Sequence, residues 1–205
     1  MGKSSVATRA LEIIDDLKAK SDLQRSLDAV LGKGNVEPEQ VENIRRLKIQ
    51  RVNFGEVLFE IAKKKNAASS KEDLRKLPAS KIIELQKLAV SKIKKMSGTV
   101  LVDMHLTVIT PQGIVAGLPV SCAKSLAPEI IILLEAPPQE VFKRRVKDKK
   151  EGDHPAGITL DALTEYMALD RSAAVCIATV AGIRIRVVQN TNVDEAANEV
   201  VRSLS

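Results

Sequence analysis

Short apolar segments with the character of β-strands occur four times along the chain, and helical segments of ten or more residues separate them. The four segments are Ile49 to Phe54, Thr99 to Met104, Ile130 to Leu134 and Gly182 to Gln189. This alternation predicts βαβ units, in which helices cover a parallel sheet. In the last segment apolar residues alternate with arginine, so that strand is expected at an outer position with one partly solvated face. The sequence therefore predicts an α/β fold.

A second feature is the amount of helix between the first two strand segments. Helices are expected at 56–65, 71–77 and 81–96, and a further long helix at 161–180. Three helices are more than a crossover connection requires, so we expect a helical subdomain over residues 55–97 that can move as a unit. All of these elements fit one compact domain in a chain of 205 residues.

Two other stretches interrupt the alternating pattern. Residues 21–46 are rich in charge, and glycine and proline break their helical patterning, which predicts an insertion of one or two short helices. Residues 146–158 contain a polar run with Gly152, Pro155 and Gly157. That run predicts a loop that forms a short lid.

Composition and the length of apolar runs exclude several classes of protein. The longest apolar stretch, around 130–134, is far shorter than the roughly 20 residues that span a membrane. Charged residues such as Arg9 and Glu12 interrupt the first helical segment, which is therefore no secretory signal, and we expect a cytoplasmic protein. Cys122 and Cys176 lack the spacing of a zinc site or a disulfide framework, so both are expected to be buried structural thiols.

The chain is basic, with a net charge of +6 and an isoelectric point near 9.3. Clustered lysine and arginine can neutralise nucleic-acid phosphates, but this chain has no Trp, one Tyr and three Phe. So few aromatic residues argue against a base-stacking platform for single strands. The same charge balance suits small polyphosphate ligands.

The start of the first helical segment carries part of a phosphate-binding motif. Apolar residues recur at three- and four-residue steps from Val6 onward, which predicts an amphipathic helix. Gly2, Lys3 and Ser4 match the last defined positions of the loop whose backbone N–H groups surround phosphates and whose lysine reaches the β and γ oxygens. Such a triplet occurs by chance in about one chain in ten of this length, so alone it is weak. Ser4 or Ser5 would offer a hydroxyl to Mg²⁺.

Charged residues elsewhere could serve phosphoryl transfer, although each alone could equally be a cap or an ion-pair partner. Asp103 lies at the carboxyl end of a strand segment, where it could orient Mg²⁺ through water. His105 follows two residues later and is expected on the same side while the strand lasts. Arg75, in the helical subdomain, could hold a monophosphate by two parallel hydrogen bonds. Three further candidates bracket the lid, namely Arg144, Arg145 and Arg171.

Set together, these motifs resemble those of archaeal adenylate kinases. The similarity is in register from about residue 47 to the C-terminus and also covers the first helix. The strings that carry it are Val52-Asn53-Phe54-Gly55-Glu56-Val57-Leu58-Phe59-Glu60, Asp73-Leu74-Arg75-Lys76-Leu77, Val102-Asp103-Met104-His105, Thr110-Pro111-Gln112-Gly113, Gly117-Leu118-Pro119, Arg144-Arg145, Asp170-Arg171-Ser172-Ala173-Ala174 and Val187-Val188-Gln189-Asn190. An ordered series of motifs is far more specific than any one of them.

The resemblance implies a three-layer nucleoside monophosphate kinase fold with a phosphate-binding loop and a five-stranded parallel sheet flanked by helices. Residues 1–205 would form one domain, with an AMP-binding helical subdomain at 55–97 and a short lid at 146–158. The implied activity is the reversible reaction ATP + AMP ⇌ 2 ADP, with Mg²⁺ carried by ATP and no other metal bound to the protein. ATP, AMP and ADP are the implied ligands. Family members often form homotrimers, and neither a membrane nor a nucleic acid is an implied partner.

The resemblance also implies roles for individual residues. The catalytic residues would be Lys3, Arg144 and Arg171. The ATP-binding residues would be Gly2, Lys3, Ser4, Ser5, Arg145 and Asn190, the last of which lies where the final strand leads into the adenine pocket. The AMP-binding residues would be Arg75, Asp103 and His105. Mg²⁺ would be near Ser4 and, through water, Asp103.

Three features depart from the family pattern. The family's first strand and the Gly-x-Pro-Gly start of its loop are absent, the lid carries Asp153-His154-Pro155 and lysines in place of further arginines, and residues 21–46 have no family counterpart. Because the first strand is central in this fold, its loss would leave two strands without partners and remove most phosphate-binding N–H groups. We therefore expect the true start to lie about a dozen residues upstream of Met1, and expect activity only with that extension.

Two alternative functions stay open at this point. Base selectivity resides in backbone contacts that a sequence barely reveals, so a kinase for CMP, UMP or dTMP is the first alternative. The basic isoelectric point and the incomplete loop leave a noncatalytic nucleotide-binding or RNA-associated protein as the second.

Overall fold

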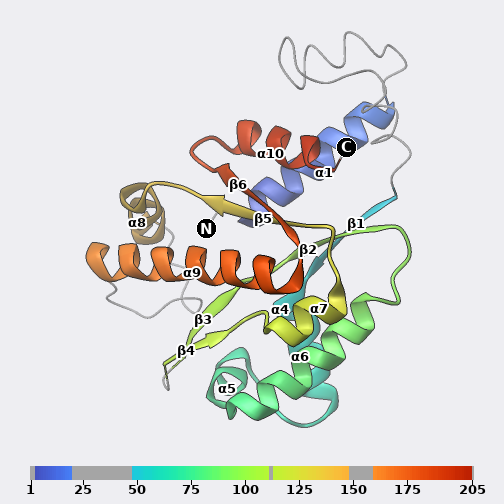
Figure 1. Cartoon of the computed structure of the whole chain (residues 1–205), viewed down its shortest axis with the longest axis vertical. Coiled ribbons are helices and arrows are strands. Elements are labelled where there is room, and N and C mark those ends of the chain that lie inside the picture. The colour runs from blue at the N-terminus through green and yellow to red at the C-terminus, as the bar shows by residue number, and fades with distance from the viewer. Residues whose placement is uncertain (1–2, 20–47, 111–112, 148–158, 205) are drawn as a thin grey trace.

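The computed structural model describes residues 3–19, 48–110, 113–147 and 159–204, and helices and strands alternate along them (Figure 1). The helices are α1 (Lys3–Ala19), α4 (Phe54–Lys64), α5 (Lys71–Lys76), α6 (Ala79–Ile93), α7 (Val120–Leu126), α8 (Pro138–Lys147), α9 (Leu160–Ala181) and α10 (Val193–Arg202). The strands are β1 (Ile49–Asn53), β2 (Thr99–Asp103), β3 (Thr107–Thr110), β4 (Gly113–Ala116), β5 (Ile130–Glu135) and β6 (Arg184–Gln189).

The strands of the α/β layer run parallel, as the sequence predicts. β1 pairs with β2 from Ile49↔Thr99 to Asn53↔Asp103, and β5 pairs with β6 from Ile130↔Arg184 to Glu135↔Gln189. Within the described ranges no ladder joins β2 to β5, because ladder bonds form only between strands that lie side by side. The described strands thus form two parallel pairs, and the single five-stranded sheet that the resemblance implies is not formed by them. Among these strands β5 and β6 pair only with each other, so the outer position expected for β6 stays a prediction.

Two hydrophobic clusters cover the two faces of the strands, which gives three layers. In β5, Ile131 and Leu133 pack into the cluster that contains α4, α6, α7 and α9, whereas Ile132 and Leu134 pack into the cluster that contains α1 and α10. Alternate residues of a strand point to opposite faces, so a strand buried on both faces is apolar throughout. In Figure 1, α1 and α10 lie side by side at the top, and the α4–α6 helices lie at the bottom.

Local capping explains where the elements begin and end. Asn53 ends β1, and its side chain accepts a hydrogen bond from Glu56 N at 3.0 Å, so Phe54 opens α4 and does not extend the strand as predicted. Gly182 ends α9 in the left-handed conformation with φ of +69°, so β6 begins two residues later than the sequence predicts. The sequence analysis also missed the antiparallel hairpin of β3 and β4.

The helical subdomain predicted at 55–97 contains three helices, α4, α5 and α6, as expected. α5 is only six residues long and depends on a capping box at its start. Asp73 N donates to Ser70 Oγ at 3.0 Å, and Ser70 N donates to Asp73 Oδ2 at 3.0 Å. Ser69 Oγ donates to the same carboxylate at 2.6 Å, and these bonds, the one from Ser69 foremost, hold the pKa of Asp73 below its ordinary value of 3.8.

We expect Ser70→Ala to destabilise the protein by about 1 kcal/mol, because the α5 N-terminus then loses its side-chain cap. The depressed pKa of Asp73 means that its contribution to stability is present above about pH 4 and is lost as the pH falls through the lower value in the folded protein. Urea titration measures the loss in Ser70→Ala. The difference in unfolding free energy between wild type and Ser69→Ala, which removes a hydroxyl that donates to the Asp73 carboxylate, should shrink below about pH 4. Ser91→Ala is the matched control, because that hydroxyl donates to the Lys87 carbonyl within α6, away from the α5 cap.

Several sequence predictions fall on other parts of the chain. The predicted insertion at 21–46 and most of the predicted lid, 148–158, lie outside the described residues; residues 146 and 147 belong to α8.

Cys122 is buried, as predicted, and burial raises the pKa of its thiol. The prediction that Cys176 is buried is wrong, because α9 turns Ala174 and Ile177 to the core and Cys176 outward. None of the described helices is both long and apolar enough to cross a membrane.

Candidate active site

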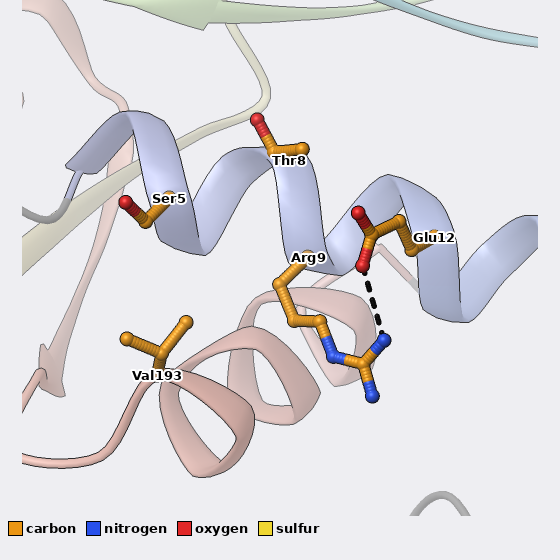
Figure 2. Close-up of a pocket in the computed structure, with 5 residues that line it drawn as sticks. All are labelled: Ser5, Thr8, Arg9, Glu12 and Val193. Atoms are coloured by element: carbon orange, nitrogen blue, oxygen red, sulfur yellow. Dashed lines mark hydrogen bonds and ion pairs between the residues drawn. The ribbon is translucent and has the colours of Figure 1, made fainter.

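The start of α1 lies against the start of α10. Val6, Ala10 and Ile14 of α1 pack in one cluster with Ala196, Ala197 and Val200 of α10. Beside this contact is an open groove of about 440 Å³, lined by Ser5, Thr8, Arg9, Glu12 and Val193 (Figure 2). The groove thus has hydroxyl and charged groups on its α1 side and an apolar side chain on its α10 side.

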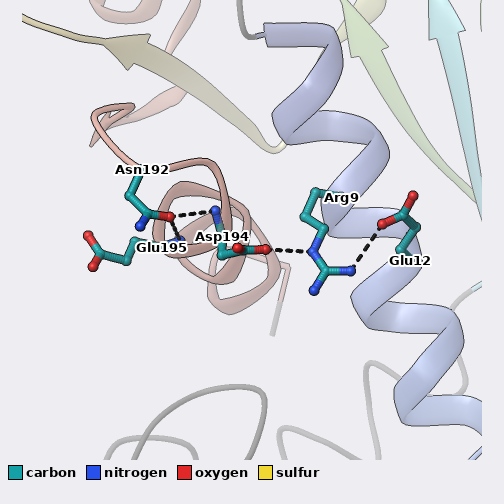
Figure 3. A network of polar contacts seen from close by, with 5 residues as sticks. All are labelled: Arg9, Glu12, Asn192, Asp194 and Glu195. Atoms are coloured by element: carbon teal, nitrogen blue, oxygen red, sulfur yellow. Dashed lines mark hydrogen bonds and ion pairs between the residues drawn. The ribbon is translucent and has the colours of Figure 1, made fainter.

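Ion pairs fix the charged wall of the groove. Arg9 Nε lies 2.6 Å from Asp194 Oδ1, and Arg9 Nη1 lies 3.0 Å from Glu12 Oε2 (Figure 3). The carboxylate of Asp194, followed by that of Glu12, raises the pKa of Arg9. Asn192 caps α10 by accepting hydrogen bonds from Asp194 N at 2.9 Å and Glu195 N at 3.3 Å. Both helices are therefore tied together at the mouth of the groove.

At the carboxyl end of β2, Asp103 is nearly buried, with an 8% exposed side chain. Its Oδ2 accepts a hydrogen bond from Arg51 Nη2 at 2.9 Å. β2 ends at Asp103, so the alternation of sides does not reach His105, which is exposed. The prediction that His105 shares the side of Asp103 therefore does not apply, because the strand is shorter than expected.

At the carboxyl ends of β5 and β6, side chains from two helices converge. Asn190 N donates to the Glu135 carbonyl at 2.5 Å and joins the two strand ends. Arg144 of α8 donates from Nη1 to the Asn190 carbonyl at 2.9 Å, and Arg171 of α9 lies 3.2 Å from the Glu135 carboxylate. Asn190 is 4% exposed, and its Oδ1 has no hydrogen-bond partner among the described residues. Two arginines and one unused acceptor thus meet at this strand edge.

Arg145 occupies a different setting from its neighbour Arg144. Its Nε and Nη1 atoms are buried and find no hydrogen-bond partner in the part of the chain that the structure describes. Burial lowers the pKa of Arg145, and nearby Tyr166 opposes that shift. A buried guanidinium with unused donors is costly unless an anion approaches it. Arg145 is therefore the described residue best prepared to accept an anionic group.

A hydrogen-bonded cluster next to Arg145 ties the β3–β4 hairpin to α9. Thr107 Oγ1 and Thr107 N donate to Asp170 Oδ1 at 2.6 and 3.1 Å. Tyr166 OH donates to the Thr107 carbonyl at 2.9 Å. Burial, followed by the charge of Asp170, raises the pKa of Tyr166. Because Arg171 directly follows Asp170, the cluster also fixes the part of α9 that carries this arginine.

The structure brings together some of the predicted site residues and separates others. Arg144, Arg171 and Asn190 meet at one strand edge, and Ser5 lines the groove beside α1. Arg75 lies in α5, at the far end of the molecule from α1 (Figure 1). Gly2 lies outside the described residues, and Lys3 and Ser4 are placed only as the first residues of α1.

Sequence reasoning missed three parts of this region: Arg51, Glu135 and the cluster of Thr107, Tyr166 and Asp170. Glu135 could have been found, because it ends an apolar strand segment just as Asp103 does. Arg51 and Thr107 carry no such signal, since their partners are distant in sequence. Across the described ranges, no group of three or more His, Cys, Asp or Glu side chains is placed to hold a metal ion.

Comparisons with known proteins agree with this geometry. Residues 31–159 match a family described as an AAA domain. The adenylate kinase of Methanopyrus kandleri is 35% identical over 160 residues, which cover 76% of this chain and 83% of that protein. The adenylate kinase of Methanocaldococcus jannaschii is 33% identical over 181 residues, with 85% and 93% covered. That of Pyrococcus furiosus is 35% identical over 173 residues, with 78% and 87% covered.

Parallel strand pairs covered by helices on both faces, with arginines gathered at the strand ends, define a nucleotide kinase of the phosphate-binding-loop class. The similarity to the three relatives extends over most of their length and most of this chain. The chain belongs to the family of archaeal adenylate kinases.

Proposed function

We propose that this chain transfers a phosphoryl group reversibly between adenine nucleotides, ATP + AMP ⇌ 2 ADP. The observation that carries the proposal is the convergence of Arg144 and Arg171, from two helices, at the carboxyl ends of β5 and β6. Two guanidinium groups at one strand edge suit a transition state whose charge spreads over the transferred phosphoryl oxygens. Membership of the adenylate kinase family supports the same reaction.

The ATP side of the proposed site is the groove between α1 and α10. Its volume of about 440 Å³ lies within the range of small-molecule sites. The first turn of α1, which begins at Lys3, has backbone N–H groups without helical partners and the positive end of the helix dipole, and both favour phosphate. We assign Gly2, Lys3, Ser4 and Ser5 to the phosphates. Val193 offers apolar surface to the nucleoside.

Arg145 and Asn190 complete the ATP side in this proposal. Arg145 has buried donors that no described residue uses, and Asn190 has a buried acceptor that no described residue uses. A nucleotide has the complementary groups, because its phosphates accept and its adenine amino group donates hydrogen bonds. Binding of ATP would thus satisfy both side chains.

The AMP side is assigned to the helical subdomain at 55–97 and the end of β2. Arg75 is half-buried in α5, and a guanidinium can hold a monophosphate by two parallel hydrogen bonds. Asp103 and His105 lie at and just beyond the carboxyl end of β2, where open α/β sheets bind ligands. Because α5 is distant from α1, phosphoryl transfer requires the helical subdomain to approach the carboxyl ends of the strands. The predicted lid at 146–158 would then exclude water from the reacting phosphates.

The catalytic work of the protein is positioning and charge neutralisation. Lys3, Arg144 and Arg171 would hold the reacting phosphates in line and neutralise the charge that develops on the transferred group. When substrate binds, Arg171 would leave its ion pair with the Glu135 carboxylate and bind a phosphoryl oxygen instead. Arg144 would likewise leave its backbone carbonyl acceptors and donate to a phosphoryl oxygen. No side chain with a shifted pKa is needed as a general base.

Mg²⁺ would enter with ATP. The available donors, the hydroxyls of Ser4 and Ser5 and the Asp103 carboxylate, are oxygen ligands of the kind Mg²⁺ prefers. When bound, Mg²⁺ neutralises phosphate charge and orients the phosphates. Arg51 already donates to Asp103 Oδ2, so this carboxylate would act through water, as the sequence predicts.

ADP production tests the proposal directly. In a coupled assay with ATP and each of AMP, CMP, UMP and dTMP, we expect AMP to give the highest kcat/KM, with the others at least about 10-fold lower. A higher rate with a pyrimidine monophosphate would assign another nucleotide kinase. Binding of ATP with no turnover of any monophosphate would favour a noncatalytic protein. The homotrimer implied by the family stays a prediction, which light scattering can check.

A further inference from the structure

Arg51 is a charged residue on a strand face that is otherwise covered by a helix. In β1, Ile49 packs with the α1–α10 cluster, whereas Val52 packs with the cluster on the other face. Because side chains alternate along a strand, Arg51 lies on the same face as Ile49, beneath α1. Its side chain is 25% exposed. A mostly buried arginine on this face requires a structural or functional reason.

The guanidinium of Arg51 bridges three separate elements. Its Nη1 donates to Thr8 Oγ1 of α1 at 2.8 Å, and its Nη2 donates to Asp103 Oδ2 of β2 at 2.9 Å. The arginine itself belongs to β1, whose last residue, Asn53, caps the first helix of the helical subdomain. One planar, fixed fork of donors thus joins α1, β1 and β2.

These three elements belong to different halves of the proposed site. α1 carries the residues assigned to the ATP phosphates, whereas β2 carries Asp103, and β1 leads into the subdomain assigned to AMP. Arg51 does not need to touch either nucleotide to affect the reaction. Both of its terminal nitrogens already donate to protein oxygens, so it is suited to hold the two halves in register.

We propose that Arg51 is a positioning residue that fixes the orientation of the ATP half of the site relative to the AMP half. This inference rests on the proposed function. In-line phosphoryl transfer depends on the alignment of donor and acceptor, and misplacement by about 1 Å can cost about 100-fold in rate. Loss of Arg51 therefore lowers kcat and the affinity for a ligand that spans both halves, while each nucleotide alone still binds its own half.

The test compares Arg51→Met with wild type, both made with the expected upstream extension. The ligands are ATP, AMP and a bisubstrate analogue in which two adenosines are joined through five phosphates. We expect the Kd of ATP and of AMP to change less than about 3-fold, and both kcat and the affinity for the bisubstrate analogue to fall about 10- to 100-fold. Equal losses for all three ligands, or no loss for the analogue, would overturn the proposal.

Two control variants separate positioning from general effects of charge and folding. Lys124→Met removes an exposed cation in the last turn of α7, outside both halves of the proposed site, and it should leave kcat and analogue binding unchanged. Arg51→Lys keeps the charge but lacks the fork of donors, so it should recover only part of the lost affinity for the analogue. Recovery to wild-type values by Arg51→Lys would contradict a role in fixing geometry.

A second variant keeps the test open if Arg51→Met does not fold. Thr8→Val removes the hydroxyl that accepts a hydrogen bond from Arg51 Nη1 and keeps the Arg51–Asp103 pair, so it should weaken binding of the bisubstrate analogue more than binding of ATP alone. Equal weakening of the two would overturn the proposal. If the wild-type protein, made with the expected upstream extension, neither forms ADP nor binds the analogue, the proposed function itself is wrong. That outcome is distinct from an active wild type with an unaffected Arg51→Met.

Discussion

In the protein made with the expected upstream extension, Lys3→Ala should lower kcat at least about 100-fold and leave the fold intact. Lys3 is the first residue of α1, and the N-terminal turn of a helix is where phosphate is bound most readily. Loss of one preorganised group that stabilises transition-state charge costs roughly 100- to 1,000-fold in rate. Among the described side chains of α1, Val6 is the first that packs in the α1–α10 cluster, so packing of the helix should not change. Steady-state kinetics with ATP and AMP, together with thermal unfolding, measure both effects.

Lys124→Ala is the matched control for Lys3→Ala. Lys124 is exposed in the last turn of α7, and its loss changes the net charge by the same amount. It should leave kcat within about 2-fold of wild type, since an exposed charge contributes little. A Lys3→Ala variant with wild-type kcat would show that the start of α1 is not the phosphate site.

Gly117→Ala should destabilise the protein by about 3 kcal/mol or more, the largest stability effect that we expect of a single methyl group here. A Cβ at this position would overlap the His105 carbonyl oxygen and lie 2.9 Å from its carbon. The backbone cannot withdraw easily, because Gly117 N donates to the Leu106 carbonyl at 2.8 Å and Gln86 Nε2 donates to the Gly117 carbonyl at 3.0 Å. Urea unfolding measures the loss.

Gly55→Ala is the same substitution with the opposite expected result. The nearest atom to its added Cβ is the side-chain oxygen of Asn53, at 3.3 Å, so a shift of a few tenths of an ångström makes room for the methyl group. Gly55 lies inside α4, where alanine is more favourable than glycine by up to about 1 kcal/mol. A stable Gly117→Ala protein would mean that the chain segments at 105 and 117 are not in close contact.

Much of the fold is predictable from the sequence, because strands buried on both faces leave continuous apolar runs. Ile130 to Leu134 is such a run, and β5 occupies it with one further residue. The β3–β4 hairpin escapes prediction although Pro111, Gln112 and Gly113 lie between two short apolar runs, which is a recognised hairpin signal. The runs are only four residues long, and their pattern is too short to stand out.

The candidate site is predictable only in part, for a related physical reason. Residues such as Asp103 are found because they end a strand, and position along a strand is a local property. Arg51 and Asp103 form their contact across 52 positions, and Thr107 and Asp170 across 63. Such contacts exist only after the chain has folded, so no local sequence pattern predicts them.

The packing of α1 against α10 has a consequence for the order of folding. The two helices are joined by the Arg9–Asp194 pair, whose partners are 185 positions apart, and by a shared apolar cluster. Closing so long a loop is entropically costly and slow compared with forming local contacts. During synthesis the proposed ATP-binding helix therefore lacks its supporting surface until α10 leaves the ribosome, so the groove for ATP forms later than the contacts among α4, α5 and α6.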